Sequence, residues 1–385
     1  MVIPFEFATA ARILFGCGKL RTLPDLCATF GSSLLLVTGK NKERHQETIT
    51  ALKTNGYAVS HFVVEREPTV ELVLNGARVA GETKVHLVVA LGGGSVIDAG
   101  KAIAALATNN FDFYRHAELV GKGEPLKTAP LPLIAIPTTA GTGAEVTRNA
   151  VIGVPDQRLK VSLRSPLMLP RIALIDPELT FSLPPEITAS TGMDALTQLI
   201  EPFVSERANP VTDALCRNGI QKAAAALPRA CCEEDRGARE EMSLASLFGG
   251  MALANAGLGA VHGFAAPIGG MYPGMAHGTI CAALLPAVME INIRELQRQQ
   301  RSDLLERFAE VTQLLTSMKE KSPEAGVAWL RNLTKCLKIP TLKALGVREQ
   351  DFETICSRAM QASSMKANPV RLGPEQLKEI LERAY

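Results

Sequence analysis

The stretch Val85–Ala107, VHLVVALGGGSVIDAGKAIAALA, joins an apolar run to a glycine turn and then to a sequence that suits a helix. The run Val85–Leu91 is typical of a strand buried on both faces of a parallel sheet. Glycines 92–94 let the backbone approach a ligand closely, and the free N–H groups at the start of the following helix favour an anion. The turn therefore predicts a phosphate-binding loop, and a tight turn without a ligand is the alternative. It does not match the dinucleotide fingerprint of glycines, because Ile97 stands where the last glycine is required.

Apolar runs and helical patterns alternate on both sides of this stretch. Strands are expected at 33–38, 60–64, 85–91 and 131–136, with helices at 42–55 and 70–83. Alternation of this kind is typical of parallel strands with covering helices. After about Leu179 the strand-like runs give way to helical patterns at 186–205, 210–226, 239–257, 280–293 and 303–315. The sequence therefore predicts an α/β domain with a Rossmann-like parallel sheet over 1–180, followed by an all-α domain over 181–385.

A second loop rich in small polar residues, PTTAGTGAE at 137–145, follows the strand predicted at 131–136. The carboxyl ends of neighbouring parallel strands border one crevice, which is where open α/β sheets bind ligands. Threonine hydroxyls and backbone amides in such a loop can hold a pyrophosphate and a ribose. The two loops together predict a dinucleotide site.

The composition is that of a soluble globular protein. The chain has 385 residues, of which 46% are hydrophobic and 21% charged, and a net charge of +2. We find no run of Lys and Arg interleaved with aromatic residues, so nucleic acid is not an expected partner. Neither a signal peptide nor a membrane span is indicated, and we expect a cytoplasmic protein without a membrane partner. The eight scattered cysteines, none in a CxxC pair, indicate reduced thiols rather than disulfides.

Asp194 stands in an otherwise apolar helical segment, STGMDALTQLIEPFVS, and a buried carboxylate needs a partner. Gln198 follows four residues later and projects from the same helix face. His262 and His277 flank a glycine-rich loop that has to fold back for their rings to meet. An aspartate, two histidines and a neutral oxygen suit Fe²⁺, Zn²⁺, Mn²⁺ or Co²⁺.

Five segments resemble the iron-containing (group III) alcohol dehydrogenases in order and spacing. They are GGGSVIDAGKAIA, IPTTAGTGAEVT, IDPELT, GMDALTQLIE and the GAVH…AHG region, and the resemblance spans nearly the whole chain. It implies a dehydroquinate synthase-like architecture, with cofactor and metal between the two domains. It also implies a homodimer or a larger homo-oligomer.

The resemblance assigns roles to particular residues. Asp194, His262 and His277 match three metal ligands. Gly93, Gly94 and Ser95 are expected to hold the pyrophosphate, with Asp98 at the next helix turn. Further cofactor contacts are implied for the following residues: Thr138, Thr139, Thr142 and Lys160.

Two positions depart from the family pattern. Gln198 stands where the family has a histidine ligand, and Ala266 stands where it has a histidine thought to help proton transfer. The remaining Asp-His-His set is similar to that of the glycerol dehydrogenases, which use zinc. Iron and zinc are therefore both open, and Gln198 is expected to be at most a weak ligand.

The turn after the strand expected at 33–38 bears on the choice between NAD and NADP. Many members have an aspartate there for the ribose of NAD, and this chain has Gly39. Lys40, Lys42 or Arg44 could attract a 2′-phosphate, so NADP use, alone or with NAD, is predicted. A solvated basic turn is the alternative.

These features predict a metal-dependent NAD(P)-linked enzyme that interconverts an alcohol and an aldehyde or ketone by hydride transfer. Three alternatives remain: a metal-independent reductase of the maleylacetate type, a lyase of the dehydroquinate synthase type, and a non-catalytic NAD(P)-binding protein. The lyase would need basic residues near the metal motifs, and we find no such cluster. Apolar candidates for the substrate pocket, which could equally be ordinary packing, are Phe264, Met271, Tyr272 and Met275.

Overall fold

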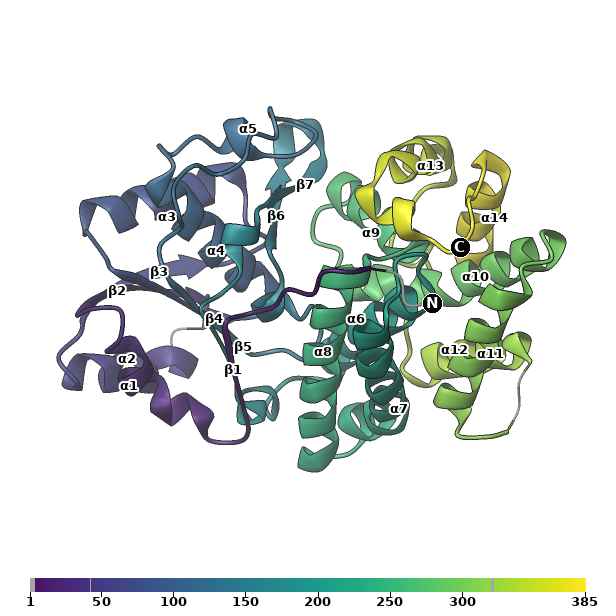
Figure 1. Ribbon diagram of the computed structural model, residues 1–385, viewed down its shortest axis with the longest axis horizontal. Coiled ribbons are helices and arrows are strands. Elements are labelled where there is room, and N and C mark those ends of the chain that lie inside the picture. The colour runs from purple at the N-terminus through teal and green to yellow at the C-terminus, as the bar shows by residue number, and fades with distance from the viewer. Residues whose placement is uncertain (1–3, 42, 320–321) are drawn as a thin grey trace. The chain divides into compact units, whose positions relative to one another are not determined.

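The computed structural model describes residues 4–41, 43–319 and 322–385 (Figure 1). Contacts between Cα atoms divide the chain into two compact units. The helical unit comprises the described residues up to Ala8, Ala140–Thr142 and Ser182–Tyr385. The sheet unit comprises Thr9–Thr139 and Gly143–Phe181. Each unit is described separately below.

A six-stranded sheet with all neighbouring strands parallel forms the centre of the sheet unit. Its order is β1-β8-β5-β4-β2-β3, which confirms the predicted Rossmann-like parallel sheet. The four predicted strands are present, with slightly different bounds. The strands of the sheet are β1 (Arg12–Phe15), β2 (Ser33–Gly39), β3 (Ala58–Val64), β4 (Leu87–Gly92), β5 (Leu133–Pro137) and β8 (Ile172–Ile175).

Alternate residues of each central strand face opposite layers of helix. Leu35 and Val37 of β2 belong to the apolar cluster that also contains α3 (Val70–Glu82) and α4 (Gly94–Thr108). Leu34 and Leu36 belong to a second cluster on the other face, which includes residues of α1 (Leu23–Cys27) and α2 (Glu43–Thr54). Burial on both faces explains why these strands are continuous apolar runs rather than alternating ones.

Four strands of the sheet unit lie outside the four ranges given above as expected strands. β1 and β8 are short, and the other two form an antiparallel hairpin, β6 (Asn149–Val154) and β7 (Leu159–Arg164). The remaining helix of this unit is α5 (Phe113–His116).

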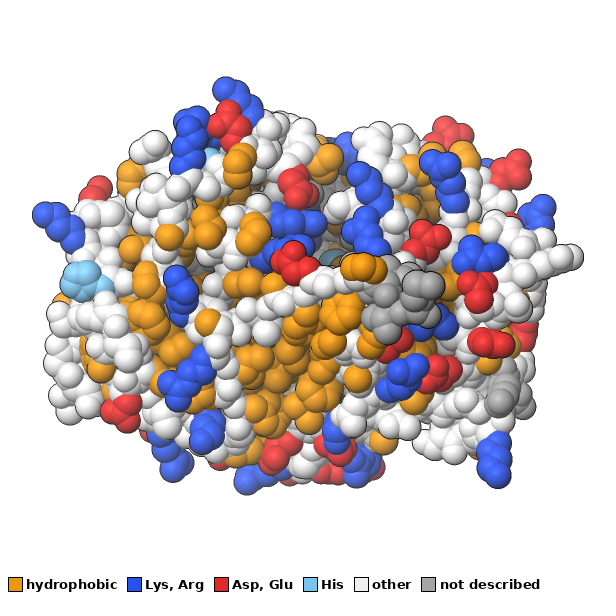
Figure 2. All heavy atoms as spheres, viewed as in Figure 1, with side chains coloured by type: hydrophobic (Ala, Val, Ile, Leu, Met, Phe, Trp, Pro, Cys, Tyr) orange, Lys and Arg blue, Asp and Glu red, His pale blue; other side chains and the backbone are white. Residues whose placement is uncertain are grey.

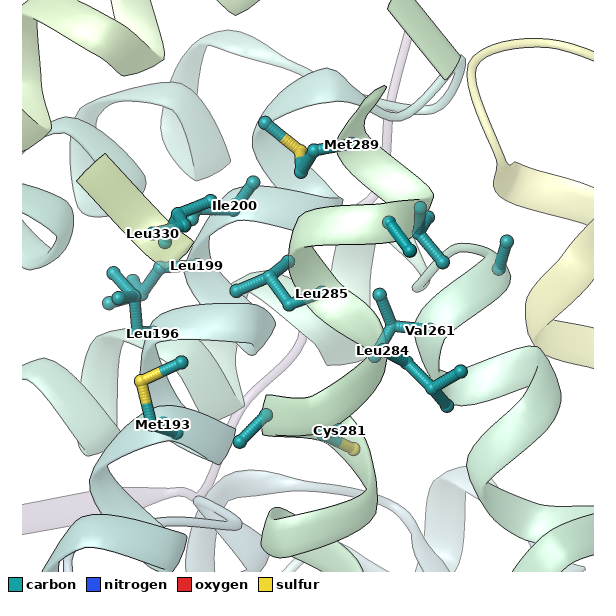
Figure 3. Packing of buried hydrophobic residues seen from close by; sticks show 14 of the residues in the cluster. Met193, Leu196, Leu199, Ile200, Val261, Cys281, Leu284, Leu285, Met289 and Leu330 are labelled. Carbon is teal, nitrogen blue, oxygen red and sulfur yellow. The ribbon is translucent and has the colours of Figure 1, made fainter. Parts of the chain in front are cut away.

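The helical unit has one extended apolar core. Figure 3 shows part of it, where side chains of α6, α9, α10 and α12 meet around Leu196, Leu199 and Leu285. All five helical patterns predicted after Leu179 correspond to helices of this unit. Its helices are α6 (Pro185–Val204), α7 (Pro210–Cys232), α8 (Arg236–Ala256), α9 (Ala260–Met271), α10 (His277–Arg298), α11 (Ser302–Thr316), α12 (Pro323–Cys336), α13 (Phe352–Gln361) and α14 (Pro374–Ala384).

Two further predictions concern the chain as a whole. Among the described residues no single helix has the length and apolar content to cross a membrane; α8 and α9 reach them only together, and they are bent by 98° at their junction. All eight cysteines, which lie in the described ranges, are free thiols, as predicted. On the face that Figure 2 shows, basic and acidic side chains are interspersed.

A buried group of ionisable side chains connects α4 to the hairpin. Lys101 of α4 is 1% exposed, and its Nζ donates to Thr147 Oγ1 at 2.7 Å and to the Asn149 carbonyl at 2.9 Å. Asp98 Oδ1 lies 3.7 Å from the same Nζ. Burial lowers the pKa of Lys101 to about 8, against the attraction of Asp98 and Glu145. Burial also raises the pKa of Glu145 to about 7.

The raised pKa of Glu145 predicts a pH-dependent stability. Between about pH 4.5 and 7 the folded state keeps the proton of Glu145, whereas the unfolded state loses it. The contribution of protonated Glu145 to the free energy of unfolding is therefore complete below about pH 4.5 and is lost as the pH rises through about 7. Relative to Glu145→Gln, the wild-type free energy of unfolding should fall by roughly 2–3 kcal/mol over that interval. Urea unfolding of both proteins measures it, with exposed Glu47→Gln as the control. Parallel pH profiles for wild type and Glu145→Gln would contradict this expectation.

Candidate metal centre and cofactor loops

Asp194 lies in the middle of α6, where it is 2% exposed. Leu196 and Leu199 on the same helix are fully buried, which explains why the segment is apolar. The Oδ1 atom of Asp194 is buried and accepts no hydrogen bond. An unsatisfied buried carboxylate oxygen is costly, so a positive partner is expected at this point.

His262 is the nearest such partner. Its Nδ1 lies 2.6 Å from Glu201 Oε2, while Glu201 Oε1 accepts the backbone N–H of Val261 at 2.7 Å. Because a carboxylate only accepts, we assign the proton to Nδ1, and this leaves Nε2 free to act as a ligand, 3.4 Å from Asp194 Oδ1. Gly259 permits this arrangement, since a Cβ there would lie 2.8 Å from Glu201 Oε1.

His277 is the first residue of α10 and reaches the same carboxylate. A Cβ on Gly278 would lie 2.2 Å from the Ser190 carbonyl, so glycine lets the start of α10 pack directly on the α6 backbone. This contact brings His277 Nε2 to 3.9 Å from Asp194 Oδ1. The rings of His262 and His277 then lie with their centroids 5.4 Å apart. The glycine-rich loop does fold back as predicted.

Cys281 was not predicted to belong to the site. Its Sγ lies 3.7 Å from His277 Nε2 and 3.9 Å from His262 Nε2. One ligand atom from each of Asp194, His262, His277 and Cys281 lies within 4.8 Å of all the others. The available signal was spacing: Cys281 follows His277 by four residues, which places both on one helix face.

The electrostatics of the cluster favour a negative carboxylate beside the imidazoles. Burial alone would raise the pKa of Asp194, but its interactions with the neighbouring imidazoles of His262 and His277 lower it below its ordinary value. Burial would likewise lower the pKa of His262, but its negative neighbours, Glu201 and Asp194 among them, raise it well above the ordinary value. A cation at this point would replace protons as the positive charge that Asp194 requires.

The donor set fits a divalent transition metal. Besides Asp194 Oδ1, the amide oxygen of Gln198 is buried and accepts no hydrogen bond. Carboxylate, imidazole and thiol donors gather here. Among the described residues, no other group of three or more His, Cys, Asp or Glu residues has its ligand atoms within 4.8 Å of one another. Glu201 accepts the Nδ1–H of His262 and thereby orients this ring toward the cluster.

Glu201→Gln is expected to weaken metal binding by roughly 10–100-fold, because the amide is a poorer acceptor for His262 Nδ1–H. Competition with a chelator of known affinity measures the change. Glu295→Gln, which alters a buried glutamate paired with Arg294 and Arg298, is the matched control. Equal metal affinity in Glu201→Gln and wild type would contradict the orienting role.

The first residues of the two predicted cofactor loops lie side by side in the sheet unit. β4 and β5 pair with Gly92 opposite Pro137, and the N–H of Thr138 donates to the Gly92 carbonyl at 3.0 Å. A Cβ on Gly93 would lie 3.6 Å from the Thr139 side chain. Gly93 is the N-cap of α4 and no side chain caps the helix. Gly94 and Ser95 begin that helix, so their N–H groups are available to an anion.

The other predicted cofactor residues have varied surroundings. Asp98 Oδ2 accepts the N–H of Val151 at 3.0 Å, which directs this carboxylate toward the hairpin. Lys160 Nζ forms an ion pair with Glu67 Oε1 at 2.5 Å. Thr142 belongs to the helical unit. A role for Asp98 in holding the cofactor stays a prediction, and its observed contacts are structural.

The basic turn after β2 is described only in part. Gly39 ends β2, and Lys40 is exposed, whereas Lys42 lies outside the described residues. The guanidinium of Arg44 donates to the Leu179 carbonyl. Lys40 is therefore the clearer candidate to meet a 2′-phosphate.

Comparison with known proteins links both halves of the chain to one family. Residues 10–177 match the model described as "Iron-containing alcohol dehydrogenase", and residues 188–385 match "Fe-containing alcohol dehydrogenase family, C-terminal". This chain belongs to the iron-containing alcohol dehydrogenase family. Alcohol dehydrogenase 4 of Saccharomyces cerevisiae is 38% identical over 320 residues, which are 83% of this chain and 81% of that protein.

Solved structures of this family agree with the fold. The crystal structure of a 1,3-propanediol oxidoreductase superposes with a TM-score of 0.92 at 33% identity and covers 100% of both chains. A sulfoacetaldehyde reductase from Bifidobacterium kashiwanohense, solved with NAD⁺, has a TM-score of 0.86 at 27% identity and covers 99% of both. The predicted architecture, family and enzyme class, an oxidoreductase of the alcohol dehydrogenase type, are thus confirmed.

In this iron-containing alcohol dehydrogenase, Gln198 and Ala266 are the two positions that depart from the expected pattern. Each lies on a helix that contributes a residue to the metal cluster. Gln198 follows Asp194 by one turn of α6 and is 3% exposed. Ala266 follows His262 by one turn of α9. Neither side chain carries an imidazole, so the site has fewer nitrogen donors and one fewer proton carrier than the resemblance implies.

The apolar residues considered for a substrate pocket belong to the packing of the helical unit. Phe264 is fully buried, and Met271 and Met275 pack against the same core. The Tyr272 hydroxyl donates to Asp351 Oδ2 and accepts the N–H of Arg348. Their contacts therefore match the packing alternative.

Proposed function

We propose that this chain is a metal-dependent, NAD(P)-linked dehydrogenase that interconverts an alcohol and an aldehyde or ketone by hydride transfer. The observation that carries the proposal is the cluster around Asp194. A buried carboxylate oxygen without a hydrogen bond lies 3.4 Å and 3.9 Å from two imidazole nitrogens that come from different helices. Family membership supplies the class of reaction.

The metal is iron or zinc, held by Asp194, His262 and His277. Gln198, Cys281 or water is left to complete the set. A divalent cation at this point supplies Lewis-acid chemistry that polarises the oxygen of an alcohol or carbonyl substrate. Glu201 keeps His262 in the tautomer whose Nε2 is free to coordinate.

The remaining chemistry belongs to the chain and to the cofactor. The N-terminus of α4 at Gly93–Ser95 would hold the pyrophosphate of the cofactor with its N–H groups, and a bound nicotinamide would supply hydride-transfer chemistry. The methyl group of Ala266 cannot take a proton. The substrate hydroxyl proton therefore passes to water or to a ribose hydroxyl of the cofactor.

We assign NAD or NADP binding to the domain 1–180 and the metal and substrate to the domain 181–385. The proposed cofactor residues are Gly39, Gly93, Gly94, Ser95, Asp98, Thr138, Thr139, Thr142 and Lys160. The expected form is a cytoplasmic homodimer or larger homo-oligomer that acts on a small alcohol or aldehyde.

Lys40→Ala should raise KM for NADPH by roughly 3–10-fold and leave KM for NADH within about twofold, because only NADPH carries a 2′-phosphate. Steady-state kinetics with both cofactors measure the difference. Lys53→Ala, on the exposed side of α2, is the control. Equal changes for the two cofactors would exclude Lys40 as the group that discriminates between them.

The test of the proposed function combines elemental analysis of the purified protein with NAD(P)H oxidation over a panel of aldehydes and ketones. We expect about one metal per chain, loss of turnover after chelation, and recovery when Fe²⁺ or Zn²⁺ is added back. Full turnover in metal-free protein would instead indicate a reductase of the maleylacetate type. NAD(P)H binding without turnover over the whole panel would indicate a non-catalytic protein.

A further inference from the structure

The metal cluster contains a donor that the family resemblance does not assign. Cys281 lies one turn after His277 on α10, is fully buried, and belongs to the edge of the apolar cluster that Figure 3 shows. Its Sγ lies 3.7 Å from His277 Nε2 and 3.9 Å from His262 Nε2. It therefore faces two imidazole nitrogens that belong to different helices.

These separations resemble the edges of a coordination tetrahedron. With metal–sulfur and metal–nitrogen bonds of about 2.3 and 2.0 Å, a tetrahedral ion keeps its sulfur and nitrogen donors about 3.5 Å apart. The observed separations of 3.7 and 3.9 Å need only a small contraction. Asp194 Oδ1 lies 3.4 Å from His262 Nε2, and this separation likewise needs only a small contraction.

We propose that Cys281 Sγ is the fourth protein ligand of the metal, so that this chain holds its cation with one carboxylate, two imidazoles and a thiolate. The proposal rests on the proposed function, since it concerns the same ion. Coordination breaks the S–H bond and forms the metal–sulfur bond, and the proton leaves to solvent. A substrate oxygen would be a fifth donor, and zinc reaches this coordination number in catalytic sites.

Gln198 is the competing candidate for this place. Its amide oxygen is neutral and is a weaker donor than a thiolate. Cys281 supplies a second negative charge besides Asp194, so the two together neutralise a divalent cation in a buried setting. The inferred arrangement uses sulfur in place of the imidazole that Gln198 does not provide.

A thiolate ligand also bears on metal identity. Soft sulfur donors favour zinc over metals that prefer oxygen and nitrogen. The inferred set therefore predicts that zinc is retained in preference to Fe²⁺ when both are offered. Other buried cysteines of the chain, such as Cys216 and Cys356, do not belong to a described cluster of three or more potential ligands, so a thiol packed in the core is not enough by itself to produce this arrangement.

X-ray absorption of the zinc-loaded full chain tests the inference directly. One sulfur scatterer at about 2.3 Å is expected in the wild type, with the remaining donors nitrogen or oxygen. The Co²⁺-loaded protein should show an intense thiolate-to-cobalt charge-transfer band in the near ultraviolet. Both signals should vanish in Cys281→Ser, and metal affinity should fall at least about 10-fold. Gln198→Ala and the control Cys356→Ser should keep both signals.

The outcomes separate this inference from the proposed function. Wild-type protein that binds metal and turns over, but shows only nitrogen and oxygen donors, overturns the thiolate ligand and leaves the dehydrogenase intact. A charge-transfer band that persists in Cys281→Ser also overturns it. Failure of the wild type to bind zinc or cobalt overturns both. Should Cys281→Ser not fold, the wild-type sulfur signal decides the question.

Discussion

Asp194→Ala should lower kcat by on the order of a thousandfold or more, because it removes the buried carboxylate that lies 3.4 and 3.9 Å from the two imidazoles. Binding of NAD(P)H should remain, since Gly93 and Thr138 belong to the sheet unit and not to the unit that contains Asp194. Metal content and cofactor affinity are measured together with turnover. The wild type should also gain thermal stability on addition of zinc, whereas the variant should not.

Two further variants make this result specific. Asp194→Asn keeps the shape of the side chain and should lose metal as well, which separates charge from packing. Asp213→Asn removes a carboxylate of the helical unit that pairs with Arg307, and should keep metal and turnover. Full activity in both Asp194→Ala and His262→Ala would show that the reaction does not use the metal.

The architecture could be predicted because burial on both faces leaves a clear pattern. β2, β4 and β5 are continuous apolar runs, and the glycine turn after β4 starts a helix as expected. β1 and β8 have four residues each, which is too short for periodicity to distinguish them from loops. The hairpin of β6 and β7 depends on pairing between its own two strands rather than on a long apolar run.

The metal site was predictable in its parts but not in its assembly. Asp194 drew attention because a carboxylate in an apolar helix is unusual, and His262 and His277 because they flank a glycine loop. In the sequence, Cys281 differs from other core cysteines only in following His277 by four residues. The packing of the start of α10 against Ser190 is what places its thiol beside the two rings. The contact of Glu201 with His262 spans 61 residues of sequence, a separation at which periodicity carries no information.

The second large effect concerns stability rather than catalysis. Lys101→Met should lower the free energy of unfolding of the sheet unit by about 3–5 kcal/mol, because it removes one partner of a buried charged group. Methionine fills most of the space but leaves the Asn149 carbonyl and the Thr147 hydroxyl without their shared donor. Asp98 then lacks its nearby cation, and Glu145 loses an attraction that favours its charged form.

Urea unfolding combined with hydrogen exchange of the α4 and β6 amides measures this loss in the sheet unit. Lys53→Met, at an exposed position of α2, should change stability by less than about 0.5 kcal/mol. The double variant Lys101→Met/Glu145→Gln should recover part of the loss at pH 8. At that pH the folded Lys101→Met protein must either keep Glu145 charged without its partner or bind a proton that the unfolded state lacks. A loss below about 1 kcal/mol in Lys101→Met would mean that the favourable interactions of the buried ammonium are offset by the cost of its desolvation. Apolar packing alone would then hold α4 to the hairpin.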